Sequence, residues 1–139
     1  MENKKLFLDT NILLDELFED RVFSKATAKK IDSFIKYGYT FVLSSLSLNT
    51  IWYIGAKKDR LKTLEFIKDF FKTDLFEVYE IKNRDIVEII SIIDKNPKAD
   101  FEDLQQYICA KNSNSIAIIT NDKNFPKIDL PLIRTENFD

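Results

Sequence analysis

Three aspartates are the residues of this sequence best placed to do chemistry. Asp9 directly follows the short apolar run 6–8, and Asp122 lies two residues after Thr120, which ends the apolar run 116–119. Asp103 lies in the first turn of the helix predicted to enter that second run. In open parallel sheets, ligands bind beyond the carboxyl ends of the strands. These three aspartates are therefore the candidate catalytic and metal-binding residues.

Carboxylates that converge at one edge of a sheet repel one another. Two of them at about 4 Å repel by roughly 1 to 4 kcal/mol between the dielectric limits of water and a protein surface. A divalent cation removes this cost, and oxygen ligands without His or Cys suit Mg²⁺ or Mn²⁺. Such a site activates water and stabilises charge on a phosphoryl group, which is the chemistry of a metal-dependent phosphodiesterase.

The composition excludes most other hydrolytic and nucleotide-binding chemistries. The chain has no His, one Cys and two Gly. Without His there is no Ser-His-Asp or Cys-His nucleophile and no imidazole base. Two isolated glycines cannot form a GxGxxG or GxxxxGK[ST] loop, and one Cys forms no internal disulfide or CxxC pair.

Each acid also has a structural interpretation. Asp100 stands where an Asp normally caps a helix, and Asp103 in the first turn complements the helix dipole. Asp9 and Asp122 stand in sequences that are typical of turns. Asp100 precedes Asp103 by three residues, so it adds a fourth charge to the group if its side chain turns inward.

The elements that position these residues fit one domain over residues 1–139. The chain has 45% hydrophobic and 32% charged residues, as soluble globular proteins do, and no linker or repeat divides it. No apolar stretch is long enough for a membrane span, so we expect a cytoplasmic protein. The formal net charge of -2 gives no overall attraction to nucleic acid, so any such binding must be local.

Apolar periodicity predicts strands that alternate with helices. Strands are expected at 6–8, 39–43, 76–81, 116–119 and, at an edge, 132–133. Helices are expected at 12–18, 23–35, 46–56, 61–71, 86–93 and 101–108. This order predicts an α/β fold, a three-layer α/β/α sandwich with a central, mostly parallel sheet of four or five strands.

Three segments, in this order along the chain, resemble the PIN domain, the fold of VapC-type toxins and other metal-dependent ribonucleases. Residues 6–13 (LFLDTNIL) resemble its opening motif, and residues 103–110 (DLQQYICA) are similar to its helix that begins with an acid. Residues 118–125 (IITNDKNF) resemble its strand-to-turn motif. The resemblance implies a PIN-like sheet and an acidic pocket that binds Mg²⁺ or Mn²⁺.

The same resemblance implies a function and residue roles. The expected activity is that of an endoribonuclease, which hydrolyses RNA phosphodiester bonds with an activated water. Asp9, Asp103 and Asp122 would be the metal ligands, with Asn11 and Thr120 as polar support. The expected partners are an RNA substrate, an antitoxin protein if the chain is the toxin of a toxin–antitoxin pair, and a second copy of the chain as a homodimer.

One residue departs from the family pattern. Most of the family carries a further acid, commonly Glu, on the helix after the second strand, and Asn49 stands there in this chain. The stretch resembles a bacterial branch of the family in which Asn is found at this place. The alternative function is therefore a catalytically weak or inactive PIN-like module that binds RNA or a partner. A phosphatase of the haloacid dehalogenase type is disfavoured, because it needs a second Asp where Asn11 stands.

Overall fold

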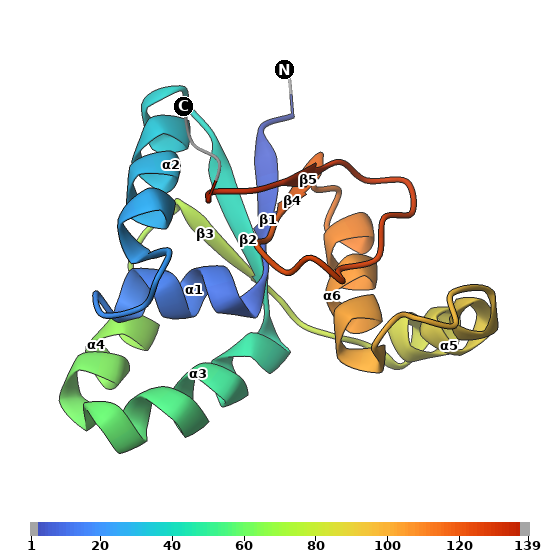
Figure 1. Cartoon of the computed structure of the whole chain (residues 1–139), viewed down its shortest axis with the longest axis horizontal. Helices are drawn as coiled ribbons and strands as arrows, with labels where there is room; N and C mark the ends of the chain where they lie inside the picture. The colour runs from blue at the N-terminus through green and yellow to red at the C-terminus, as the bar shows by residue number, and fades with distance from the viewer. Residues whose placement is uncertain (1–2, 137–139) are drawn as a thin grey trace.

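One five-stranded parallel sheet forms the centre of the protein in a computed structural model that describes residues 3–136 (Figure 1). Its strands are β1 (Lys5–Leu8), β2 (Thr40–Ser44), β3 (Phe76–Tyr79), β4 (Ala117–Ile119) and β5 (Leu132–Ile133). They lie in the order β3-β2-β1-β4-β5, and every neighbouring pair is parallel. All the carboxyl ends therefore meet at one edge, as predicted.

Six α-helices connect the strands within the described residues. They are α1 (Thr10–Leu17), α2 (Ser24–Lys36), α3 (Ser45–Lys58), α4 (Arg60–Phe70), α5 (Asn83–Ile92) and α6 (Phe101–Asn112), with a 3-10 turn at Ile93–Lys95. Helix α6 continues beyond the predicted residue 108 because Cys109 and Ala110 are buried against the sheet. Among residues 3–136, no helix combines the length and the apolarity needed to cross a membrane.

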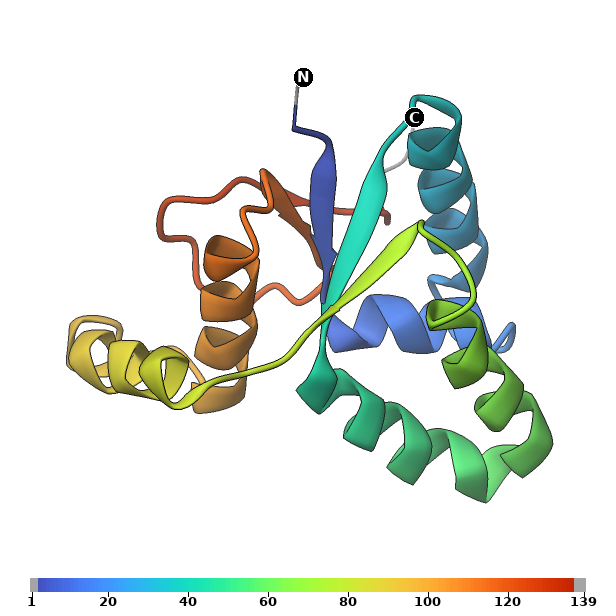
Figure 2. The same ribbon diagram turned by 180° about the vertical axis from the view of Figure 1, so that it is seen from behind.

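The two faces of the sheet are covered by different helices, which confirms the three-layer sandwich. Leu6 and Leu8 of β1 point into a core formed with helices α1 to α4, whereas Phe7 points into a core formed with α5 and α6. This alternation is the period of two expected of a strand that is buried on both faces. Figure 2 shows α5 and α6 on one side of the sheet and α1 to α4 on the other.

The central strand β1 and its neighbour β2 are each followed by a helix with almost no loop between. Only Asp9 separates β1 from α1, and β2 is followed directly by α3. The Ser44 hydroxyl caps α3 by accepting a hydrogen bond from the Leu46 N–H at 3.1 Å. The polar residues at these junctions are consequently held by regular secondary structure on both sides.

Candidate acidic site at the carboxyl edge of the sheet

Asp9 is buried at the end of β1, and its backbone extends the pairing with β4. The Asp9 N–H donates to the Ile119 carbonyl at 3.1 Å. Asp9 is the N-cap residue of α1, but its side chain makes no capping hydrogen bond. The carboxylate instead accepts a hydrogen bond from the Thr120 hydroxyl at 2.7 Å. This contact turns the carboxylate toward the end of β4.

A buried glutamine supplies the cap that Asp9 does not. The Gln106 Oε1 accepts a hydrogen bond from the Thr10 N–H, the first of α1, at 3.0 Å, and the same side chain hydrogen-bonds the Asp9 carboxylate. The Thr10 and Ser47 hydroxyls share a hydrogen bond at 2.7 Å. Helices α1, α3 and α6 are thus joined beside Asp9. Gln106 was missed in the sequence, although it lies three residues after Asp103 and hence on the same side of α6.

Asp103 lies half-buried in the first turn of α6. Asp100 is the N-cap of this helix, and its carboxylate accepts a hydrogen bond from the Glu102 N–H at 3.4 Å. The capping interpretation of Asp100 is therefore confirmed. Its exposed side chain still contributes to the electrostatic field at Asp103.

Asp122 lies in the turn that follows β4. Its backbone N–H donates to the Thr120 hydroxyl at 3.1 Å, and its carboxylate accepts a hydrogen bond from the Asn124 N–H at 2.9 Å. The fully buried Thr120 hydroxyl therefore links the backbone of Asp122 to the carboxylate of Asp9.

The aspartates lie close enough to disfavour one another's charge. Burial, followed by repulsion from Asp122, Asp9 and Asp100, raises the pKa of Asp103 to about 7. Burial also raises the pKa of Asp9, although the hydrogen bonds from Thr120 and Gln106 oppose the shift. At neutral pH without a cation, the site therefore tends to retain a proton.

Asn11 and Asn49, like Asp100, are predicted site residues that the structure leaves exposed. Asn11 lies in the first turn of α1, and Asn49 lies on α3. Within residues 3–136, neither side chain hydrogen-bonds Asp9, Asp103 or Asp122. The connection between these elements runs instead through the buried hydroxyl of Ser47.

The donors suit a divalent cation that keeps part of its water shell. Within the described part of the chain, no three His, Cys, Asp or Glu side chains are arranged so that they could hold a metal ion together. Mg²⁺ does not need such an arrangement, because it usually keeps several waters and binds through one or two carboxylates. A cation here would also relieve the repulsion that raises the pKa of Asp103. The carboxylates of Asp9, Asp103 and Asp122 thus have the donor chemistry that Mg²⁺ or Mn²⁺ prefers, and contact with all three would run in part through the ion's waters.

Replacing Asp103 with Asn should stabilise the metal-free protein at high pH. The pKa of Asp103 rises from 3.8 to about 7 on folding, so its stabilising contribution is present below pH 4 and is lost as the pH rises through 7. In EDTA, the melting temperature of Asp103→Asn relative to wild type should therefore increase between pH 5 and pH 8. The matched control is Glu102→Gln in the same turn, which should show no such trend. If the difference in melting temperature between Asp103→Asn and wild type did not change with pH, the raised pKa of Asp103 would be contradicted.

Known proteins resemble the chain over nearly its whole length. Ribonuclease VapC1 of Aquifex aeolicus is 31% identical over 140 residues, which cover 99% of this chain and 95% of that protein. Two solved structures share the fold at lower identity. VapC20 of Mycobacterium tuberculosis, a toxin that cleaves the sarcin–ricin loop, has a TM-score of 0.73 and 9% identity, covering 86% of this chain and 92% of its own. One chain of a toxin–antitoxin complex from Klebsiella pneumoniae has a TM-score of 0.66 and 20% identity. The match covers 94% of this chain and 97% of that one.

The family follows from the sequence match as well as from the fold. The PIN domain model matches residues 6–130, a range that begins within β1 and includes Asp9, Asp103 and Asp122. Together with the relative of 31% identity, this match agrees with the parallel sheet and with the acids at its carboxyl edge. The chain belongs to the PIN domain family.

Proposed function

We propose that this protein is a ribonuclease that hydrolyses RNA phosphodiester bonds with Mg²⁺ or Mn²⁺ held by Asp9, Asp103 and Asp122. The observation that carries the proposal is the gathering of these carboxylates at one edge of the sheet, where burial of Asp103 and then repulsion from Asp122, Asp9 and Asp100 raise the pKa of Asp103 to about 7. The reaction class is supported by the 31% identity to a protein named as a ribonuclease and by the family match.

The side chains of the site have separable tasks in this proposal. The cation, when bound, supplies the positive charge that polarises a scissile phosphate and lowers the pKa of an attacking water. Asp9 is held in one orientation by Thr120 and Gln106, which both hydrogen-bond its carboxylate. Asp103 must lose its proton before the site carries its full negative charge, and one of the three carboxylates accepts the proton of the attacking water.

We also propose that an antitoxin protein binds this protein and that the protein acts in the cytoplasm. The support is the likeness to ribonuclease VapC1 and to a chain that was solved in a toxin–antitoxin complex. A homodimer stays a prediction from the sequence.

Asn49 favours a second candidate function, that of an inactive RNA- or partner-binding module. It places an exposed, neutral amide on α3 where most of the family has a carboxylate. An amide oxygen can contact a water of the cation's shell, but it adds no charge that would hold the cation. This candidate predicts RNA binding without cleavage.

Cleavage of RNA with and without EDTA tests the primary proposal. With millimolar Mg²⁺ or Mn²⁺, the purified protein should cleave RNA from a mixed pool of tRNA and ribosomal RNA, and EDTA should abolish the activity. Asp9→Asn and Asp122→Asn should each lower the rate by about 100-fold or more, because each removes a charge that holds the cation. The matched control is Asp74→Asn, an exposed aspartate after α4, which should cleave at the wild-type rate. Wild-type protein that binds RNA but never cleaves it would favour the second candidate.

Gln106→Met tests the positioning of Asp9. Methionine has a similar shape but accepts no hydrogen bond from the Thr10 N–H and donates none to Asp9. We expect the free energy of unfolding to fall by about 1–3 kcal/mol, because a buried N–H loses its partner. Mn²⁺ affinity in calorimetry should fall about tenfold, as for other groups that orient a metal ligand. Gln105→Met, one residue away, should change neither value. Unchanged Mn²⁺ affinity in Gln106→Met would show that Gln106 does not position Asp9.

A further inference from the structure

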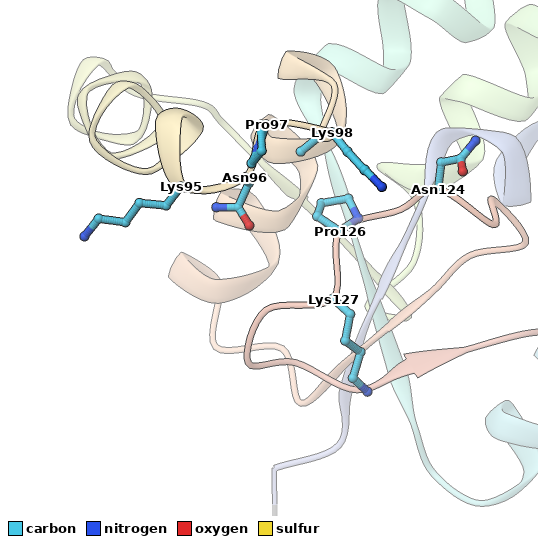
Figure 3. Close-up of a pocket in the computed structure, with 8 residues that line it drawn as sticks. Lys95, Asn96, Pro97, Lys98, Asn124, Pro126 and Lys127 are labelled. Atoms are coloured by element: carbon cyan, nitrogen blue, oxygen red, sulfur yellow. The ribbon is translucent and has the colours of Figure 1, made fainter.

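A pocket lined by lysines lies between the loop that precedes α6 and the segment that follows β4. Its volume is about 290 Å³, and its walls come from residues 95–99 together with Asn124, Pro126 and Lys127 (Figure 3). Lys95, Lys98 and Lys127 all line it, and no acidic side chain of the described residues does. We call it the lysine pocket.

The lysine pocket adjoins the acidic site through two short connections. Lys98 precedes Asp100, the N-cap residue of the helix that bears Asp103, by two residues. Asn124 lines the pocket, and its backbone N–H donates to the Asp122 carboxylate at 2.9 Å. A ligand that extended from the acidic site along residues 98–100 or along residues 122–124 would therefore enter the lysine pocket.

The charge of the pocket is not neutralised within the protein. Lys95, Lys98 and Lys127 are exposed, and none forms an ion pair with an acidic side chain of residues 3–136. The protein as a whole carries a net charge of -2, and the neighbouring acidic site repels phosphates when no cation is bound. The pocket is therefore a local source of attraction for a polyanion at this edge of the molecule.

The arrangement of the lysines fits a nucleic-acid strand better than a small anion. Figure 3 shows Lys98 extended toward Asn124, whereas Lys95 and Lys127 extend outward at different ends of the pocket. Their ammonium groups point in different directions and do not converge on one point. Charges dispersed in this way suit a strand with several phosphates better than one small anion, and the rings of Pro97 and Pro126 add apolar surface for a sugar or base. The volume is at the lower end of the range for small-molecule sites, so it suits about one nucleotide unit.

We propose that the lysine pocket binds the RNA backbone beside the scissile phosphate and so positions the strand over the acidic site. This inference rests on the proposed ribonuclease function for its substrate, but its binding step does not depend on catalysis. Single-stranded RNA is the expected ligand, because an exposed strand can follow both the pocket and the adjoining acids.

Binding of a short fluorescein-labelled single-stranded RNA, followed by anisotropy, tests the proposal without cleavage. The protein carries Asp9→Asn throughout, and the test variant adds Lys95→Gln, Lys98→Gln and Lys127→Gln. We expect RNA affinity to fall about tenfold at moderate salt and the slope of log affinity against log salt to lose about 2, since each contact in a single strand contributes about 0.7.

The matched control neutralises three exposed lysines elsewhere, with Lys25→Gln, Lys36→Gln and Lys62→Gln. Lys25 and Lys36 lie on α2, which covers the opposite face of the sheet from α6. This variant should keep the salt slope within experimental error. An equal loss in both variants would overturn the proposal, because it would show an effect of net charge alone.

Two further measurements separate this inference from the ribonuclease proposal. With Asp9 intact, the variant that carries Lys95→Gln, Lys98→Gln and Lys127→Gln (the pocket variant) should have a lower kcat/KM for RNA, while kcat at saturating RNA stays unchanged.

If wild-type protein cleaves no RNA but the pocket variant still loses binding, the ribonuclease proposal fails and the pocket inference stands. If wild type cleaves RNA and the pocket variant binds as the control does, the pocket inference fails alone. Displacement of RNA by inorganic phosphate beyond the effect of chloride at equal ionic strength would also overturn it, since it would indicate a small-anion site.

Discussion

The burial and mutual repulsion of carboxylates at the end of a parallel sheet are the constraint on which the acidic site of this molecule depends. Parallel pairing of β1 with β4 places Asp9 beside the turn that holds Asp122, and α6 brings Asp103 to the same edge. Burial and repulsion together raise the pKa of Asp103 to about 7, so the arrangement costs stability without a proton or a cation. A fold that retains such a cost has a reason to bind positive charge there.

Buried hydrogen bonds hold this edge against the repulsion. Gln106 caps α1 and leaves the Asp9 carboxylate directed toward Thr120, so one amide performs the task that an N-cap aspartate usually has. A second chain of hydrogen bonds begins beside the site. The Asn121 side chain donates to the Thr135 hydroxyl at 2.6 Å, and that hydroxyl shares a hydrogen bond with Thr27 of α2 at 2.8 Å. The turn after β4 is thereby fastened to the layer on the other face of the sheet.

The sequence was sufficient for the layers and for the strand-end acids, because both follow from apolar runs that stop at polar residues. The sequence was insufficient for features that depend on contacts between residues far apart in the chain. The predicted strand 76–81 ends at Tyr79, because its partner β2 ends at Ser44 and offers no further residue to pair with. Gln106 has the residue type of an exposed helix position and is buried only because α1 begins next to it. The lysine pocket is formed by loops about 25 residues apart in the chain, so no local pattern indicates it.

The central claim is that Asp9, Asp103 and Asp122 together hold a divalent cation. Anomalous diffraction from crystals soaked in Mn²⁺ at pH 8, where Asp103 is ionised, measures this directly. We expect one or more Mn²⁺ peaks within direct or water-mediated reach of all three carboxylates, and loss of these peaks in Asp9→Asn crystals. Well-ordered crystals with no Mn²⁺ among the three aspartates, or with Mn²⁺ bound only elsewhere, would contradict it.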